Sequence, residues 1–405
     1  MLGSVYVVLA IDTEGPVTDR KHSDLLSNWR DVDRFVASLC DDNYRQEVLD
    51  SKGNGLVISW FLLSWTGFTT NPVQREFGYH KIFDHYERQF GAEMRRFGDG
   101  IYWHYHHPSR SGVANEWNTD WSTSDEYVNV LNRLVIDRWY FPSVFRAGGA
   151  IETNEMSRWL EQWIPIDYSS RAASLDWDAV GESGGTRLRE LSDWSRAPRD
   201  WTAYHPGDAD YQRPGTMRRI IFRCPDLLTA VHAFSESDVE LAFAQAAGGE
   251  SVVLATFDHD YRERAELFTE RLTRTVGRVA ARHPEVTWNY ASALDAAQAV
   301  FGWKSREGPV FELSRNHLDG PEVVIQTKRP LFGPMPYVVC HYPNPDEYLH
   351  VTASQDGDGR WLLSLPEAGE SCVIGIASSD PFGNVGVSQY QWDGHRKVLS
   401  ERKRE

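Results

Sequence analysis

The chain has 405 residues, a length that allows a sizeable core and about two domains. Hydrophobic residues make up 41% and charged residues 25%, which excludes a disordered chain and is typical of globular proteins. The net charge of −16 argues against general affinity for nucleic acid or for anionic membranes. The sequence has no apolar run long enough to span a bilayer, so an integral membrane protein is not expected.

The first half of the chain opens with alternating strand-like and helix-like segments. Residues 4–12 are apolar but short, lack a basic flank and lead into acidic residues, so they predict a first strand, not a signal peptide. A cytoplasmic location is therefore expected, and the four scattered cysteines predict buried reduced thiols. Residues 55–65 are a continuous apolar run, typical of a strand buried on both faces. Residues 71–98 have helical periodicity and end at a glycine.

The same alternation continues to about residue 303. Residues 101–107 predict a strand that ends at Pro108, because proline has no N–H for the ladder. Residues 122–140 begin with Ser and Asp capping signals and predict a helix. Further strands are expected at 142–149, 164–170, 250–260 and 285–292, and further helices at 151–163, 237–249, 262–283 and 293–303.

Repeated strand–helix units with buried strands indicate a parallel sheet. Polar residues follow several of these strands at their C-terminal ends, where the active sites of barrels form. We therefore expect an α/β fold, a distorted (β/α) barrel over residues 1–303. Residues 171–219 break the pattern and are rich in aromatic residues, Gly and Pro, which predicts an insertion that shapes the substrate cleft. The short strand-like segments over residues 304–405 predict a small all-β, sandwich-like accessory domain.

Three histidines lie together at the end of one predicted strand, at His104, His106 and His107. Side chains alternate along a strand, so His104 and His106 share one face and His107 lies on the other. Two imidazoles on one face can hold a divalent cation, provided that a third ligand comes from another element. The alternative is a polar cluster at a strand end that binds no metal.

Other strand ends offer the missing groups. Asp12 and Glu14 are two residues apart at the end of the first strand and share a face, although alone they would be an ordinary acidic turn. Arg146 follows a strand in "FRAGG", and His259 ends one in "FDHDY". Asp258 faces the opposite way from His259, so a structural role is expected for it.

The order D-x-E-G-P, H-x-H, F-R-x-G and a strand-ending His resembles the polysaccharide deacetylases of the NodB-homology type over residues 6–300. The resemblance implies a distorted barrel that binds one divalent metal and hydrolyses N-acetyl, sometimes O-acetyl, groups on sugars. It implies that Asp12 is the general base, that Arg146 pairs with this base, and that His259 is the general acid. The metal ligands that it implies are Glu14, His104 and His106.

The sequence departs from the family's pattern in three places. The family's acidic pair is commonly two adjacent aspartates, whereas here an Asp and a Glu are separated by one residue. The family's histidines are usually four apart, and here that position after His104 is Pro108, so His107 is an alternative ligand. The family's fourth motif has two candidates, Asp167 and Asp176.

The residue types suit amide hydrolysis, which needs an activated water, a polarised carbonyl and a protonated leaving nitrogen. Two imidazoles and a carboxylate suit Zn²⁺, and other first-row divalent ions also accept this set. The aromatic-rich insertion favours a sugar substrate, because aromatic rings stack on sugar rings. The candidates for that contact are Trp177, Trp194, Trp201 and Tyr204.

The sequence therefore predicts a metal-dependent carbohydrate deacetylase, which we expect to act in surface polysaccharide biosynthesis. The expected substrate is a nucleotide-linked or lipid-linked glycan. Two alternatives stay open: the same fold acting on a non-sugar amide or ureide, and a glycan-binding protein whose catalytic domain is degenerate.

Overall fold

The computed structural model describes residues 2–17, 25–47, 49–64, 81–108, 110–111, 120–172, 192–227, 234–262, 269–316, 322–365, 370–396 and 398–404. The chain divides into two compact units. The first comprises Met1–Thr123, Val144–Ser157 and Ile166–Trp303, and the second Ser124–Ser143, Arg158–Pro165 and Lys304–Glu405. Two stretches from the first 303 residues thus belong to the C-terminal unit.

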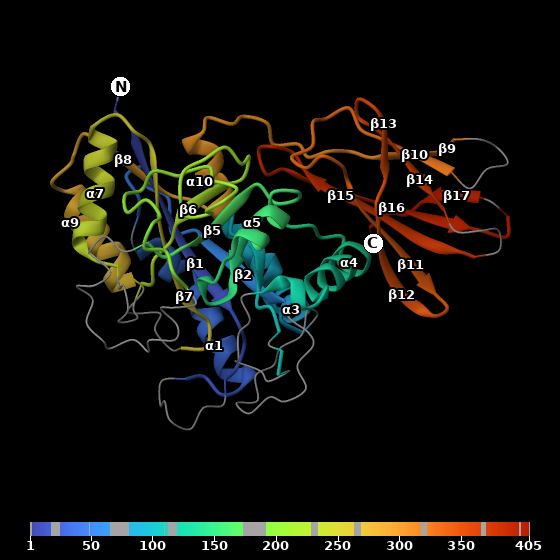
Figure 1. Cartoon of the computed structure of the whole chain (residues 1–405). Coiled ribbons are helices and arrows are strands. Elements are labelled where there is room, and N and C mark those ends of the chain that lie inside the picture. Colours follow the sequence, from blue (N-terminus) through green and yellow to red (C-terminus); the bar gives the residue numbers. More distant parts are fainter. Residues whose placement is uncertain are drawn as a thin grey trace. The chain divides into compact units, whose positions relative to one another are not determined.

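The first unit is built on a curled sheet in which eight of the described strands are hydrogen-bonded in parallel (Figure 1). Its main order is β6-β5-β4-β3-β2-β1-β7, with β8 paired to β1. The strands are β1 (Ser4–Thr13), β2 (Ile58–Ser64), β3 (Gly100–Tyr105), β4 (Val144–Ala147), β5 (Ile166–Ser170), β6 (Ile220–Arg223), β7 (Val252–His259) and β8 (Thr287–Tyr290).

The sheet curls towards a barrel, but no ladder between described strands closes it. A parallel bridge between Asp226, just after β6, and Phe257 of β7 connects the two ends of the strand order. The expected α/β class with a barrel-like parallel sheet is therefore present, but among the described strands a single bridge, and not a full ladder, connects the two ends of the sheet.

Helices alternate with these strands as the sequence predicts. The α7 helix begins with a capping box in which Ser235 and Asp238 satisfy each other's backbone N–H groups. The expected helix at 262–283 is shorter among the described residues, where a π-helical turn at Thr269–Thr273 leads into α9. The first unit contains α1 (Trp29–Leu39), α2 (Asp42–Glu47), α3 (Lys81–Phe97), α7 (Glu236–Ala247), α9 (Arg274–Ala280) and α10 (Ala293–Val300), with single turns at Trp121–Thr123 and Gly148–Ala150. The sequence analysis did not identify α1, α2 or the four-residue strand β6.

One apolar cluster lines one face of the curled sheet. Alternate residues of its strands contribute, for example Val8 and Ala10 of β1 and Ala255 and Phe257 of β7, and α10 packs its alanines against them. The same alternation continues along these strands to Asp12 and His259, so residues beyond the core remain on this face.

The described part of the expected insertion, residues 192–219, has no helix and no strand of the main sheet. It is nevertheless packed: Trp194, Tyr204 and Tyr211 form a buried cluster with Ile221 of β6. The aromatic residues of this segment therefore supply a small core of their own.

The second unit contains two antiparallel sheets and one long helix. A single apolar cluster draws on both sheets, with Trp361 and Leu363 from one and Ile374 and Ile376 from the other. Their orders are β13-β14-β10-β9 and β12-β11-β15-β16-β17. The strands are β9 (Glu312–Arg315), β10 (Glu322–Gln326), β11 (Tyr337–Pro343), β12 (Asp346–Val351), β13 (Ser354–Gly357), β14 (Arg360–Ser364), β15 (Cys372–Ser379), β16 (Val385–Asp393) and β17 (Val398–Glu401).

The helix of this unit, α4 (Glu126–Arg138), packs on the five-stranded sheet. Gln389 donates from its amide to the carbonyls of Val135 and Ile136, at 2.7 and 2.8 Å. A Cβ on Gly375 would lie 2.8 Å from Val135 Cγ1, so glycine permits the close approach of helix and sheet. The helix α5 (Asn154–Leu160) crosses the boundary between the two units.

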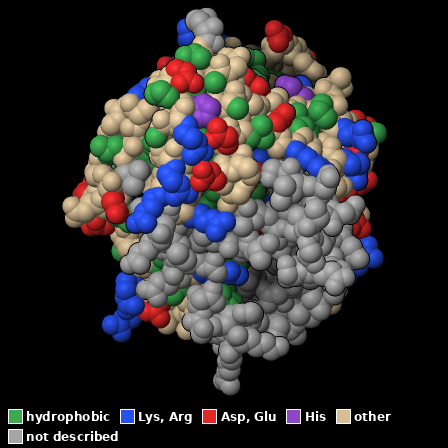
Figure 2. Space-filling model, turned by 90° about the vertical axis from the view of Figure 1, so that its left-hand side faces the viewer, with side chains coloured by type: hydrophobic (Ala, Val, Ile, Leu, Met, Phe, Trp, Pro, Cys, Tyr) green, Lys and Arg blue, Asp and Glu red, His purple; other side chains and the backbone are tan. Residues whose placement is uncertain are grey.

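The side of the molecule that carries α7 and α9 shows basic side chains beside acidic ones (Figure 2). Arg278 lies 3.2 Å from Glu236, and Arg282 lies 2.7 Å from Glu240. The two signs of charge are thus interleaved on this face. None of the described helices is long and apolar enough to cross a membrane.

Candidate metal centre

Chemically active side chains converge at the C-terminal edge of the curled sheet. The register pairs Asp12 of β1 with His259 of β7, and His104 of β3 with Arg146 of β4. Parallel strands end at the same edge, so these groups meet although they come from four separate strands.

Three buried side chains form a cluster that could hold one metal ion: Glu14, His104 and His106. The two Nε2 atoms lie 3.1 Å apart, and Glu14 Oε1 lies 3.4 Å from His106 Nε2 and 3.8 Å from His104 Nε2. Tetrahedral ligands at ordinary zinc distances are separated by about 3.3 Å. The cluster therefore has nearly the spacing of a ligand set.

Second contacts orient both imidazoles. The Nδ1 of His104 lies 2.9 Å from the carbonyl oxygen of Arg146, which suits an Nδ1–H donor and leaves Nε2 for a metal. The ring of His106 lies against Gly148, where a Cβ would come within 2.4 Å of its Cδ2. The glycine after "FRA" therefore leaves space for the imidazole of His106.

His107, the alternative ligand, lies outside this cluster. Its Nδ1 is 3.1 Å from the Tyr105 hydroxyl and its Nε2 is 3.1 Å from Thr123 Oγ1. Burial lowers the pKa of His107 to about 4, so the ring is neutral near pH 7. The expectation that it replaces a ligand is corrected, because its two ring nitrogens face Tyr105 and Thr123 and not Glu14.

Asp12 lies beside the cluster in a fixed ion pair. Arg146 donates from Nε to both carboxylate oxygens at 2.9 Å, and its Nη1 donates to the Tyr168 carbonyl at 2.7 Å. The guanidinium also lies 3.5 Å from the centre of the Phe257 ring. Asp12 Oδ2 is 3.9 Å from His104 Nε2. Arg146 thus holds this carboxylate at the edge of the cluster.

His259 also approaches Glu14, with Nε2 3.7 Å from Glu14 Oε1. Its side chain is 18% exposed, whereas those of Glu14, His104 and His106 are at most 3% exposed, so it has the best access to a ligand among these four. Burial opposes its protonation, but the carboxylates of Asp258, Glu14 and Asp12 outweigh burial and raise its pKa. Asp258 also accepts a hydrogen bond from the backbone N–H of His259 at 2.8 Å.

Asp260 is a further buried residue beside the cluster that no sequence motif singled out. This buried carboxylate accepts hydrogen bonds from the backbone N–H of Glu14 and of Gly15 and from the hydroxyl of Tyr86. Burial raises its pKa to about 6. The sequence showed only that His259 has an aspartate on each side, Asp258 and Asp260. Nothing in the sequence linked Asp260 to the helix that carries Tyr86.

The aromatic residues expected to stack on sugar are used otherwise. Trp194 is 1% exposed and donates to the Ala150 carbonyl at 2.8 Å, and so packs behind the turn that holds Gly148. Trp201 is buried and donates to the Asp238 carbonyl, and Tyr204 is buried in the core of the same segment. Their rings leave no open face for a sugar. Trp177 lies outside the described residues.

Neither candidate for the family's fourth motif joins the cluster in the described structure. Asp167 accepts a hydrogen bond from Arg219, which also donates to Glu152, and all three side chains are buried. Asp176 lies outside the described residues.

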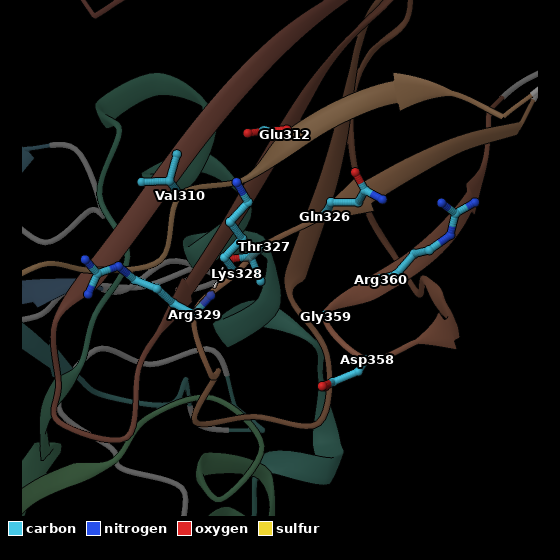
Figure 3. Close-up of a pocket in the computed structure, with 9 residues that line it drawn as sticks. All are labelled: Val310, Glu312, Gln326, Thr327, Lys328, Arg329, Asp358, Gly359 and Arg360. Atoms are coloured by element: carbon cyan, nitrogen blue, oxygen red, sulfur yellow. Dashed lines mark hydrogen bonds between the residues drawn. The ribbon is translucent and has the colours of Figure 1, made fainter.

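A separate pocket of about 450 Å³ lies in the second unit (Figure 3). Arg329 and Arg360 point to opposite sides of it, and Lys328, Glu312 and Asp358 are among its lining residues. Arg329 is bound to Glu307, and Arg360 donates to Asp356 at 2.7 Å, so both guanidinium groups already have acidic partners. The residues of the metal cluster are not part of this pocket.

No protein-family model and no curated protein matches the chain. Among solved structures, the chain is similar to a Cellulomonas fimi endo-beta-1,4-mannanase double mutant, with 11% sequence identity over 95% of this chain and 94% of that chain. The TM-score is 0.29, a level at which the likeness carries no argument.

Proposed function

We propose that this chain is a metal-dependent hydrolase that removes N-acetyl or other acyl groups from a sugar, related to the polysaccharide deacetylases of the NodB-homology type. One observation carries the proposal. Beside the cluster of Glu14, His104 and His106 lie an arginine-held carboxylate, Asp12, and the imidazole of His259, and these two residues are paired across β1 and β7. A ligand set with a carboxylate and an imidazole next to it offers the base and the acid that metal-assisted amide hydrolysis needs.

The donor set suits zinc best. Three protein ligands of the His/His/carboxylate type leave a fourth position for water or substrate, as in catalytic zinc sites. The hydrogen bond from His104 to the Arg146 carbonyl is the kind of second contact that metal-bound imidazoles make. Zn²⁺ is therefore the ion that we propose, held by Glu14, His104 and His106.

The chain's own residues move the protons in this proposal. A bound divalent ion supplies a polarised acyl carbonyl and a more acidic water. Asp12 accepts the proton of the attacking water, and Arg146 keeps the carboxylate in position through its two contacts at 2.9 Å. His259 donates a proton to the nitrogen as the C–N bond breaks, so that the products are a carboxylic acid and a free amine.

The sugar part of the proposal rests on the order of the four strand-end motifs, which resembles that of the polysaccharide deacetylases. The substrate that we propose is a nucleotide-linked or lipid-linked glycan handled in the cytoplasm during synthesis of a surface polysaccharide. A simple acylated amide serves as the comparison substrate, because hydrolysis of that compound alone would favour the non-sugar alternative.

The test is acetate release from N-acetylated chitooligosaccharides by zinc-loaded protein, with Asp12→Asn beside the wild type. General-base catalysis is worth about 10²–10⁴-fold, so the variant should lose about that much of kcat while it retains its metal. Asp50→Asn is the control, because Asp50 is also a buried aspartate, but its carboxylate accepts backbone N–H groups and is not part of the cluster. Equal rates in wild type and Asp12→Asn would overturn the assignment of the base. Zinc-loaded wild type that hydrolyses no acylated sugar would overturn the substrate class.

A further inference from the structure

The metal ligand Glu14 lies just beyond the end of β1, which stops at Thr13. Its backbone therefore no longer belongs to the ladder that fixes the strand. A ligand on a loose strand end would have to be ordered when the ion binds, at a cost in affinity. Something other than the sheet must hold this peptide.

Asp260 supplies that hold. One of its oxygens accepts from Glu14 N at 2.8 Å, and the other accepts from Gly15 N at 2.9 Å. Its own N–H donates to the Asp12 carbonyl at 3.2 Å. The residue thus clamps the end of β1 to the end of β7, directly after His259.

The carboxylate of Asp260 is itself held by a hydrogen bond from helix α3. Tyr86 of α3 donates from its hydroxyl to Asp260 Oδ2 at 2.7 Å, and its side chain is fully buried. Gly15 adopts φ +72°, and a Cβ there would lie 2.9 Å from Ile82 Cδ1 and 3.0 Å from Trp29 Cη2. The peptide after Glu14 is therefore hydrogen-bonded on one side and pressed against α1 and α3 on the other.

We propose that Asp260, held by Tyr86, is a positioning residue that sets the backbone of Glu14 for binding a divalent cation and keeps His259 in register with it. This inference rests on the proposed metal centre and deepens it. The role is specific to a carboxylate, because two oxygens are needed for the two N–H groups. An asparagine accepts at one oxygen only and turns an amide N–H₂ towards the other donor.

The experiment measures zinc affinity of the full chain by competition with a chromophoric chelator, for wild type, Asp260→Asn and Tyr86→Phe. Loss of an outer contact of this kind costs about 10–100-fold in metal affinity, and that is the effect expected for Asp260→Asn. Tyr86→Phe removes one hydrogen bond and should weaken zinc binding about two- to tenfold. If Asp260→Asn does not fold, the zinc affinity of Tyr86→Phe alone tests the proposed role of Asp260.

Asp50→Asn is again the matched control. The carboxylate of Asp50 accepts hydrogen bonds from the backbone N–H groups of Lys52, Asn54 and Tyr290. Tyr290 is paired with Val7 of β1, which lies seven residues before Glu14. That separation is roughly 23 Å along a strand. The control should lower the melting temperature of the metal-free protein and leave zinc affinity within about twofold of the wild type.

The outcomes separate this inference from the metal centre itself. Zinc binding that falls in both clamp variants and not in the control supports the clamp. Wild type that binds zinc, with clamp variants equal to it or weakened no more than the control, overturns the clamp and leaves the metal centre standing. Wild type that binds no divalent ion overturns both.

Discussion

Two buried clusters of the first unit gather acidic and basic side chains, and they differ in what stands at their centre. In one, the guanidinium of Arg219 donates to Glu152, to Asp167 and to the hydroxyl of Ser157. A cation of the chain itself lies between the carboxylates. The three charged side chains are fully buried, so the cluster is part of the core.

In the other cluster, the groups that approach one another are lone-pair donors: one carboxylate of Glu14 and the Nε2 atoms of His104 and His106. Arg146 lies nearby, but its Nε is bound to Asp12. Burying such donors within 3.1–3.8 Å of one another is useful where a cation binds among them. Both clusters are buried and charged, so the group at the centre is what distinguishes the structural cluster from the candidate site.

Removal of the central cation should have the largest effect on the first cluster. Arg219→Met leaves two carboxylates buried without their partner, which should cost about 3–5 kcal/mol of the free energy of unfolding. Urea denaturation followed by tryptophan fluorescence measures this loss. The zinc content of whatever folds should stay at the wild-type level. A stable variant that has lost its zinc would break the distinction between the two clusters.

A smaller effect should appear in the pH dependence of stability. Burial, and then the neighbouring Asp167, raises the pKa of Glu152 to about 8, against the partial opposition of Arg219. A raised folded-state pKa gives stability that is fully present below the unfolded pKa of 4.5 and is lost as the pH rises through about 8. Between about pH 6 and 8.5 the wild type should lose about 2 kcal/mol, and Glu152→Gln should lose much less.

Glu155→Gln, at an exposed position of α5, is the control and should keep the wild-type pH dependence. Identical pH slopes for wild type and Glu152→Gln would show that Arg219 keeps both carboxylates ionised. The first cluster would then be an ordinary ion-pair triad that holds no proton.

The sequence could predict which residues meet at the candidate site because ligand chemistry recurs at strand ends. Asp12, His104, Arg146 and His259 lie on or directly at separate parallel strands, and parallel strands place their ends at one edge. The spacing of His104 and His106 also pointed to the two histidines that join the cluster, although the sequence left His107 open as a ligand. The meeting of strand ends follows from strand periodicity, which is local, whereas the role of each residue was implied by the resemblance to the deacetylase family.

Contacts that depend on packing between distant elements could not be predicted. Asp260 meets Tyr86 across 174 residues, and only the folded sheet brings them together. The aromatic residues of the insertion were expected at a substrate surface, because composition does not distinguish a ring that packs from a ring that binds. Trp194 and Trp201 are buried and bonded to backbone carbonyls.

The sequence also could not predict which segments form each of the two compact units. The pattern of strands and helices led to a boundary near residue 303, and the apolar face of α4 gave no sign of its partner sheet. In the structure this helix packs on β11, β12 and β15 within the second unit. An amphipathic helix shows that it has a buried face, but not which sheet covers it.

The most direct test of the metal centre is the metal content of purified, tag-free protein, measured by mass spectrometry. Wild type is compared with the double variant His104→Ala/His106→Ala and with His107→Ala, a neighbouring histidine outside the cluster. We predict about one equivalent of zinc or a similar divalent ion in wild type and in His107→Ala, and its loss in the double variant. Absence of metal from all three proteins after incubation with zinc, or equal metal in all three, would contradict the centre formed by Glu14, His104 and His106.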